Sequence, residues 1–285
     1  MKIGILGGTG LDDPDILLTR SELVFDKSAT RTAANGLPAD YGEPLDNLVS
    51  GVIEGVECVI LARHGRQHQW NPSNVNYRAN FLALKQAGCD LVIATHSVGS
   101  LVEEYKPRDF ILLDQVIDRT QKRNLTYYDN KDTSFKGVYH ASFGDPYDTK
   151  LRQVIIDSSE ELGFPLHQTG TCVAIEGPRF SSRAESLMFK QWGANLVGMT
   201  QVPEAQLAKE LNLPFVAIAM VTDYDAWKQD AKPVTVEEIV KTLRSNGDKM
   251  IKFLKRIIPM IAASNDWKVE TKADEGLITR PLPTE

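Results

Sequence analysis

The chain begins MKIGILGGTGLDDPDI (residues 1–16), an apolar run that passes directly into a cluster of glycines. Residues 2–6 have the apolar, β-branched character of a buried strand, and the glycines that follow predict a tight turn. This start is typical of α/β folds, in which such a turn often binds a phosphate group. Such a turn can bind the phosphate of a dinucleotide, the phosphate of a nucleoside triphosphate or a smaller anion. The rest of the sequence is needed to distinguish these possibilities.

The glycine turn does not fit the two common phosphate-binding fingerprints. Asp13 stands where the dinucleotide fingerprint has its third glycine, and Asp12 and Asp15 lie beside it, so that carboxylates crowd the place where a pyrophosphate would bind. The Lys-Ser/Thr pair of a triphosphate loop is absent after the glycines. The turn and the Thr9 hydroxyl therefore either bind one small oxyanion or have a purely structural role.

Apolar β-rich runs alternate with helical patterns along the chain. We expect strands at 2–6, 58–62, 91–95, 110–116, 196–198 and 215–221, and helices at 73–88, 151–162, 185–192, 204–211 and from 235 onward. Ser73 and Thr235 are the expected N-caps. The alternation predicts an α/β fold, and because no segment resembles a linker between two cores, residues 1–285 are expected to form a single domain.

The composition is that of a globular protein with no electrostatic footprint for nucleic acid. The 285 residues are 42% hydrophobic and 25% charged, with a formal net charge of −6 and no basic stripe along the sequence. We expect neither a membrane span nor a signal peptide. The three cysteines, Cys58, Cys89 and Cys172, lack metal-ligand spacing. We therefore expect buried thiols, no metal and a cytoplasmic location.

Two segments place chemically useful side chains at the ends of expected strands. Arg63 and His64 follow the strand at 58–62 and offer hydrogen-bond donors to an anion. Asp223 and Asp225 follow the strand at 215–221. Because α/β proteins bind ligands at the carboxyl ends of strands, each pair either belongs to a site or only stabilises the next turn.

Six motifs resemble, in order and spacing, the methylthioadenosine-cleaving members of the trimeric branch of the purine nucleoside phosphorylase family. They are GGTGLDDP (7–14), ARHGRQH (62–68), PSNVNYRAN (72–80), IEGPRFSSRAES (175–186), MTQVPEAQLAKE (199–210) and TDYDAWK (222–228). The resemblance extends from Lys2 to near Ile261. It implies a single α/β domain with a twisted central mixed sheet flanked by helices, assembled as a homotrimer with active sites near the subunit boundaries.

The resemblance also implies an activity. The family cleaves the N-glycosidic bond of a nucleoside with inorganic phosphate as co-substrate and without a further cofactor. We therefore expect phosphorolysis of 5′-methylthioadenosine to adenine and 5-methylthioribose 1-phosphate, a step of purine and methionine salvage. The expected partners are a small nucleoside and phosphate, and neither nucleic acid nor a membrane.

The family's site residues transfer to this chain position by position. Phosphate contacts are implied for Thr9, Arg63, His64 and Thr200. Nucleoside contacts are implied for Phe180, Ser181, Met199, Val236 and, from the adjacent subunit, His140. Leu277 or Leu282 is expected near the 5′ end of the sugar. Asp223 is the expected proton donor or hydrogen-bond partner of purine N7, and Asp225 either orients Asp223 or accepts from the 6-amino group through water.

Base choice depends on two of these positions. The branch of the family that cleaves 6-oxopurine nucleosides has Glu where this chain has Ser181, and Asn where it has Asp223. Ser181 and Asp223 suit the amino group of adenine, because a site built for one hydrogen-bond pattern leaves polar groups unpaired with the other. A phosphorylase with another nucleoside preference (adenosine, methylthioinosine or inosine) is the alternative.

The chain departs from the family pattern in two places. His96 and Ser97 stand where the family commonly has Thr and Ala beside the phosphate and the ribose, so His96 adds a donor to the phosphate, reshapes the ribose site through its bulk, or has a structural role. Residues 27–42 are longer than expected. The tail at 268–285 is expected to pack on a neighbouring subunit. Three other functions stay open: a water-using nucleosidase, a nicotinamide-dependent oxidoreductase suggested only by the glycine turn, and a silent purine-binding protein.

Overall fold

The structure is a computed structural model that describes residues 1–8, 16–23, 41–130, 135–228, 236–264 and 276–279. Its principal sheet contains β1 (Lys2–Gly7), β2 (Leu18–Leu23), β3 (Leu48–Ile53), β4 (Val56–Ala62), β5 (Leu91–Ser100), β6 (Phe110–Leu112), β7 (Gln115–Arg119), β9 (Leu166–His167), β10 (Thr171–Ile175), β11 (Leu196–Gly198) and β12 (Phe215–Asp223). The helices are α1 (Tyr77–Gln86), α2 (Thr149–Glu161), α3 (Arg183–Gln191), α4 (Gln201–Glu210) and α5 (Val236–Ala263). A separate ribbon pairs β8 (Val138–Ala141) with β13 (Gly276–Thr279).

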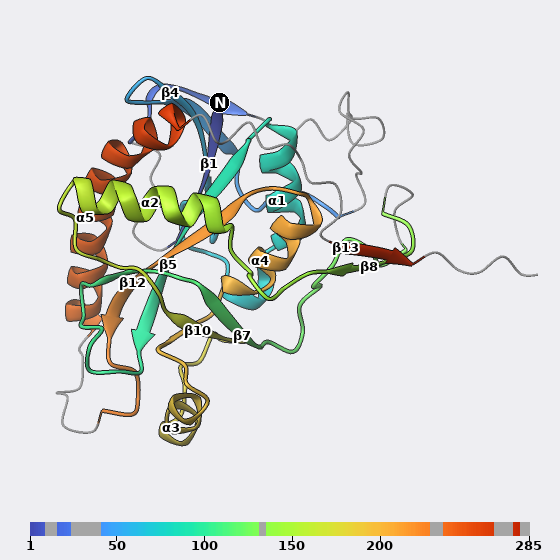
Figure 1. The fold of residues 1–285 in the computed structure, drawn as a ribbon. Helices are drawn as coiled ribbons and strands as arrows, with labels where there is room; N and C mark the ends of the chain where they lie inside the picture. The colour runs from blue at the N-terminus through green and yellow to red at the C-terminus, as the bar shows by residue number, and fades with distance from the viewer. Residues whose placement is uncertain (9–15, 24–40, 131–134, 229–235, 265–275, 280–285) are drawn as a thin grey trace, which may run out of the picture.

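The sheet is mixed and lies between two helical layers, which confirms the expected α/β fold. Its order is β2-β3-β4-β1-β5-β11-β10-β7, with β12 between β5 and β6, and β9 beside β6. Alternate residues along a strand face opposite sides of the sheet. Val92 of β5 lies in a core with Phe81 of α1, whereas Ile93 lies in a second core with Leu254 of α5. Figure 1 shows α1 and α4 on one side of the sheet and α2 and α5 on the other.

The central strand β5 forms a fork in the sheet. On one edge it pairs with β1 as far as Ala94, and then with β11 from Gly99 onward. On its other edge β12 runs beside it from Phe215↔Val92 to Asp223↔Gly99. Between Ala94 and Gly99 the described pairings therefore place no strand on the first edge. Residues 95–98 of β5 lie in this opening, next to the carboxyl ends of β1 and β4.

Several expected elements have different bounds in the structure. β5 continues to Ser100, well beyond the expected end at residue 95, because β12 pairs with it along this length. The expected strand at 110–116 is two strands, since β6 pairs with β12 and β9 whereas β7 pairs with β10. Asn76 caps α1 with a side-chain acceptor 3.3 Å from the Ala79 amide, so the expected cap at Ser73 is wrong.

The C-terminal segments lie partly outside the described residues. The N-cap expected at Thr235 and residues 268–275 and 280–285 of the tail belong to the part that the structure does not describe. Residues 276–279 form β13 and pair with β8 of the same chain. Contact of the tail with a neighbouring subunit stays a prediction.

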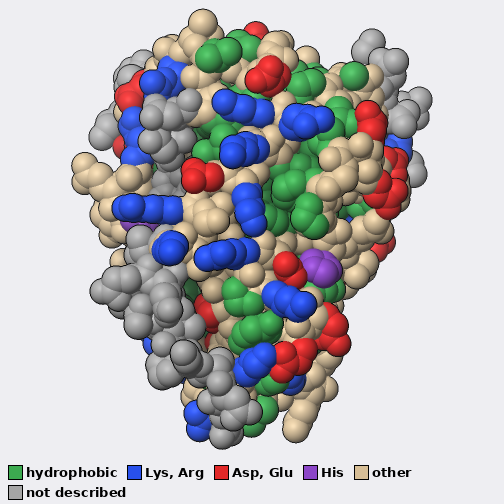
Figure 2. Space-filling view, turned by 90° about the vertical axis from the view of Figure 1, so that its left-hand side faces the viewer, with side chains coloured by type: hydrophobic (Ala, Val, Ile, Leu, Met, Phe, Trp, Pro, Cys, Tyr) green, Lys and Arg blue, Asp and Glu red, His purple; other side chains and the backbone are tan. Residues whose placement is uncertain are grey.

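The solvent face of α5 is basic, although the protein as a whole is acidic. Figure 2 looks onto this side of the molecule and shows Lys and Arg side chains gathered there. The exposed residues of α5 include Lys249, Lys252, Lys255 and Arg256. The helical period brings these residues onto one face, which the linear sequence does not make apparent. The expectation of no basic stripe is therefore wrong for this helix.

Within the described residues, no helix combines the length and the apolar character that crossing a membrane requires.

Candidate active site

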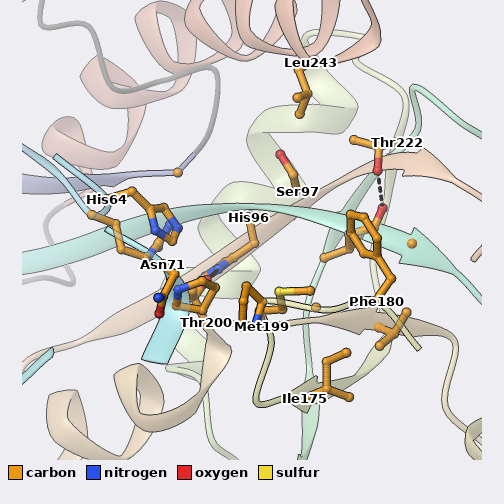
Figure 3. A pocket seen from close by; sticks show the side chains of 18 of the residues that line it. His64, Asn71, His96, Ser97, Ile175, Phe180, Met199, Thr200, Thr222 and Leu243 are labelled. Carbon is orange, nitrogen blue, oxygen red and sulfur yellow. Dashed lines mark hydrogen bonds between the residues drawn. The ribbon is translucent and has the colours of Figure 1, made fainter. Parts of the chain in front are cut away.

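A cavity of about 500 Å³ opens at the fork of the sheet. Its walls come from the ends of β4, β5, β11 and β12, from residues 68–72, and from the loop that precedes α3. The cavity brings together ten of the site residues expected from the sequence: Arg63, His64, His96, Ser97, Phe180, Ser181, Met199, Thr200, Asp223 and Asp225. Figure 3 shows that Met199 lies between a group containing His64, His96 and Thr200 and a second group containing Phe180 and Thr222. We call these groups the anion end and the base end.

Three expected site residues are not part of this cavity as described. Thr9 lies outside the described residues, and Val236 is described only as the first backbone position of α5. His140 lies on β8 and does not line the cavity of its own chain. Of the two tail leucines, Leu277 belongs to β13 and Leu282 is not described.

Arg63 is the buried cation of the anion end. Its side chain is 1% exposed, and its Nε and Nη2 donate to the two carboxylate oxygens of Glu204, with Nη2 at 3.0 Å from Oε2. Nη1 donates to the carbonyl oxygen of Thr95 at 2.9 Å. Arginine has five N–H donors, so two of them are left for a ligand after these three bonds. The guanidinium of Arg63 is therefore directed mainly at Glu204, and only its two remaining N–H groups are left for a ligand.

Glu204 was not among the expected site residues. It lies on α4, is 0% exposed, and sits 141 residues from Arg63 in the sequence. Burial raises the pKa of this carboxyl, and Arg63 acts in the opposite direction. A carboxyl group that accepts two hydrogen bonds from one guanidinium has the geometry of an ion pair, so Glu204 is ionised. The only signal in the sequence is its place within the motif at residues 199–210.

Gly8 allows the first strand to end against Arg63. A Cβ atom at this position would lie 2.8 Å from Nη1 of Arg63 and 2.5 Å from the carbonyl oxygen of Thr95. Neither contact is tolerable, so a side chain here would displace the guanidinium. The glycine turn thus has a steric role in the anion end, whatever residues 9–15 contribute.

His64 is held in one tautomer by the backbone. Its Nδ1 lies 2.8 Å from the carbonyl oxygen of Trp70. Because a carbonyl only accepts, Nδ1 carries a proton. The ring of His68 lies 4.8 Å from the ring of His64, centroid to centroid, so the segment after β4 supplies two imidazoles to this wall of the cavity.

His96 lies at the back of the anion end and touches both Thr200 and Glu204. Its Nδ1 is 2.9 Å from Oγ1 of Thr200, and its Nε2 is 3.5 Å from Oε2 of Glu204. The side chain is 1% exposed. Burial, followed by the charges of Arg63 and His64, lowers the pKa of His96 well below its usual value. The imidazole is therefore neutral near pH 7.

The base end is organised around the carboxylate of Asp223. Oδ2 accepts from the Thr222 hydroxyl at 2.7 Å, the bond drawn dashed in Figure 3, and Oδ1 accepts from the Asp225 amide at 2.8 Å. These two donors fix the orientation of the carboxyl group. Phe180 is 73% exposed although it lines the cavity, so this end is open on the side of Phe180.

Asp225 is a carboxyl of the base end whose pKa is shifted by its surroundings. Burial raises its pKa above the usual value, and the nearby charge of Asp223 acts in the same direction. Its backbone adopts a positive φ of 44°, a conformation uncommon outside glycine. Asp225 thus orients Asp223 through its backbone amide, while burial makes ionisation of its own side chain less favourable.

Several cavity residues were not among the expected site residues. They include Trp70, Asn71, Pro72, Ile175, Val197 and Leu243. Most of them are apolar, and in the sequence an apolar cavity residue looks like any core residue.

The three cysteines are buried and unpaired, and burial raises the pKa of Cys58 and of Cys89 to about 12. Among the described residues, no three His, Cys, Asp or Glu side chains are grouped as a metal site.

Comparison with known proteins gives consistent results. The sequence profile of the Phosphorylase superfamily matches residues 2–259. The chain is 47% identical to an S-methyl-5′-thioadenosine phosphorylase of Danio rerio, over 97% of this chain and 94% of the relative. It is 48% identical to the protein of the same name from Xenopus tropicalis, over 94% and 91% of the two chains.

Solved structures agree with the sequence relatives. The methylthioadenosine phosphorylase from Schistosoma mansoni in complex with adenine superposes with a TM-score of 0.83 at 36% identity, over 94% of this chain and 93% of that chain. A variant of the adenosine/methylthioadenosine phosphorylase from the same organism, in complex with methylthioadenosine, superposes with a TM-score of 0.81 at 37% identity, over the same shares of the two chains.

Proposed function

The chain belongs to the Phosphorylase superfamily, and we propose from this that it cleaves 5′-methylthioadenosine with inorganic phosphate. The products are adenine and 5-methylthioribose 1-phosphate, so the protein is a purine nucleoside phosphorylase-type pentosyltransferase of purine and methionine salvage. The chain is 47–48% identical to S-methyl-5′-thioadenosine phosphorylases over nearly its whole length, and this similarity supports the activity.

The observation that carries the proposal is the pairing of two chemically different ends in one cavity. Arg63, His64 and Thr200 provide donors to an anion at one end, and Asp223 provides a fixed carboxyl at the other. A sugar ring between them, beside Met199, meets the phosphate at C1′ while the purine leaves toward Asp223. The distance between the ends is thus bridged by the nucleoside itself.

The reaction needs charge stabilisation more than covalent chemistry. The glycosidic bond breaks through a sugar with cationic character, and the anionic phosphate stabilises this charge from the anion end. The leaving purine gains a proton or strong hydrogen bond at N7 from Asp223, which the Thr222 hydroxyl and the Asp225 amide hold in place. The proposal involves inorganic phosphate as co-substrate and no cofactor.

We also propose that the enzyme is a cytoplasmic homotrimer whose subunits complete one another's sites. Phe180 lines the cavity but is 73% exposed, and His140 lies outside the cavity of its own chain. A neighbouring subunit that covers the side of Phe180 and inserts His140 accounts for both observations. Analytical ultracentrifugation of the purified protein tests this, and a monomeric active enzyme would contradict it.

A second candidate substrate is adenosine. The related protein from Schistosoma mansoni is described as an adenosine/methylthioadenosine phosphorylase, and His96 and Ser97 change the wall that faces the ribose. The test compares the phosphate-dependent release of base from methylthioadenosine, adenosine and inosine by the purified protein. We expect methylthioadenosine to have the highest kcat/KM. Faster cleavage of inosine, or base release that does not depend on phosphate, would exclude the proposed function.

A further inference from the structure

His96 forms the middle of a buried row of three polar groups. Thr200 Oγ1 lies 2.9 Å from Nδ1 on one side of the ring, and Glu204 Oε2 lies 3.5 Å from Nε2 on the other. All three residues are at most 6% exposed. Nε2 has no hydrogen-bond partner among the described atoms, although it faces the carboxylate. The row joins the carboxylate that holds Arg63 to the hydroxyl that lines the cavity.

The position of Glu204 determines the tautomer of the neutral His96 ring. A proton on Nε2 faces a carboxylate oxygen, whereas a lone pair there would be repelled by it. The neutral ring therefore carries its proton on Nε2, and its Nδ1 is an acceptor. At 2.9 Å from Nδ1, the Thr200 hydroxyl must then be the donor. In this state Thr200 has no proton to donate to a ligand in the cavity.

The hydroxyl of Thr200 is also unused by its own helix. Thr200 occupies the N-cap position of α4, where a threonine side chain ordinarily accepts from the first amides of the helix, but it makes no such bond. Its contact with His96 therefore replaces the usual cap. The Thr200 hydroxyl thus lies at the cavity wall, and the charge of the His96 ring determines whether this hydroxyl donates its proton to the ring or to another group.

Burial, together with the positive charges around the ring, keeps His96 neutral until an anion arrives. The charged or titratable groups that face it are Arg63 and His64, which follow β4, and Glu204 on α4, whose carboxylate is already bonded to Arg63. A doubly negative anion bound beside Arg63 and His64 offsets these positive charges and stabilises an imidazolium.

We propose that His96 takes up one proton when the oxyanion binds, and that this releases the Thr200 hydroxyl to donate to the oxyanion. The inference rests on the proposed function, because it assigns the anion end to phosphate. A solvent proton forms the new Nδ1–H bond, the Nε2–H bond persists, and Nδ1–H donates to Thr200 Oγ1. The Thr200 O–H then rotates toward the anion. On release of the anion the proton returns to solvent. His96 is in this scheme a positioning residue that acts through Thr200.

Calorimetry with sulfate provides a direct test. Sulfate is a phosphate-shaped dianion with no proton to exchange near neutral pH, so any proton bound with it goes to the protein. The binding enthalpy is measured at one pH in two buffers that differ in ionisation enthalpy, which gives the number of protons taken up per site. We expect the wild type to take up about one proton more than His96→Thr, whose hydroxyl cannot be protonated in this range.

Two further variants locate the proton. His64→Asn removes a donor of the anion end and should weaken sulfate binding, but the proton uptake per bound sulfate should persist, because the row of His96, Thr200 and Glu204 stays intact. His167→Asn should behave as the wild type, because His167 contacts Asp109 and does not line the cavity. Equal proton numbers for the wild type and His96→Thr overturn the proposal. So does loss of the uptake in His64→Asn together with its persistence in His96→Thr.

The wild type alone also tests the tautomer, which keeps the proposal falsifiable if His96→Thr fails to fold. Nitrogen-15 NMR of the labelled histidines should show one His96 nitrogen as an unprotonated acceptor without sulfate and both nitrogens protonated with it. Phosphate-dependent adenine release is measured in parallel. Adenine release without proton uptake overturns this inference only, whereas failure to bind either anion and to release adenine overturns the proposed function as well.

Discussion

Arg63 and Glu204 form an ion pair that is closed to solvent on both sides. The two side chains are 1% and 0% exposed, and Nη2 of Arg63 donates to Oε2 of Glu204 at 3.0 Å, with Nε directed at the other carboxylate oxygen. The pair joins the end of β4 to α4. It therefore links the strand that precedes Arg63 and His64 to the helix whose N-cap position is Thr200.

Removing the charge of Glu204 is expected to destabilise the protein strongly. Glu204→Gln leaves a buried guanidinium without its counterion, and breaking such a pair typically costs about 3–5 kcal/mol in the free energy of unfolding. Urea unfolding of the variant and the wild type measures this loss. Glu103→Gln is the matched control, because Glu103 pairs with Lys228 at the surface with 62% of its side chain exposed, and exposed pairs contribute about 0–1 kcal/mol. A loss for Glu204→Gln no larger than that of the control would contradict the role of the pair.

The importance of Glu204 could not be predicted from its sequence context. A glutamate in a helix with Lys209 and Glu210 nearby looks like a solvated residue, and its partner Arg63 is 141 positions away. The residues at the ends of apolar strands were predictable, since Arg63, His64, Asp223 and Asp225 all line the cavity. The ends of β4 and β12 follow closely from the local hydrophobic pattern, whereas buried ion pairs depend on how the sheet is ordered.

The fork of the sheet also depends on tertiary contacts. The apolar run of β5 ends at Thr95, so the sequence suggests that the strand ends there. The strand instead continues through His96 and Ser97, because β12 provides hydrogen-bond partners as far as Gly99. Local pattern finds a strand where its residues are apolar, and it misses the polar continuation that lines the cavity.

Replacement of Asp223 by alanine is expected to reduce turnover while leaving the fold intact. The side chain is only partly buried at the end of β12 and its carboxyl bonds are local, to Thr222 and Asp225. Loss of the proposed partner of purine N7 should lower kcat by about 10²–10⁴-fold. Steady-state phosphorolysis of methylthioadenosine and urea unfolding are measured together. Asp157→Ala, on the exposed face of α2, is the control and should retain activity. If Asp223→Ala also retained it, the acid role would be misassigned.

Stability should depend on pH through Asp225. Burial raises the pKa of this carboxyl in the folded protein, so its ionisation is less favourable there than in the unfolded chain. The protein therefore binds more protons when folded in this range, and the contribution of Asp225 is present at low pH and lost as the pH rises through the raised pKa. Asp225→Asn cannot ionise and avoids this loss. The free energy of unfolding is measured for both proteins from acid to neutral pH. The value for Asp225→Asn, relative to that of the wild type, should increase as the pH rises. A difference that stays constant or shrinks would contradict the raised pKa.

Base preference is expected to change when both residues of the base end are replaced. Ser181 and Asp223 line the same end of the cavity, and Ser181→Glu with Asp223→Asn supplies the hydrogen-bond pattern that a 6-oxopurine requires. The ratio of kcat/KM for inosine to that for methylthioadenosine should rise by at least about 100-fold, because a mismatched pattern leaves buried polar groups unpaired. Each single variant is the control, since one change alone leaves a mixed pattern that suits neither base and should lower activity on methylthioadenosine without gain on inosine. If the double variant kept its preference for methylthioadenosine, discrimination between the bases would have to arise elsewhere in the cavity.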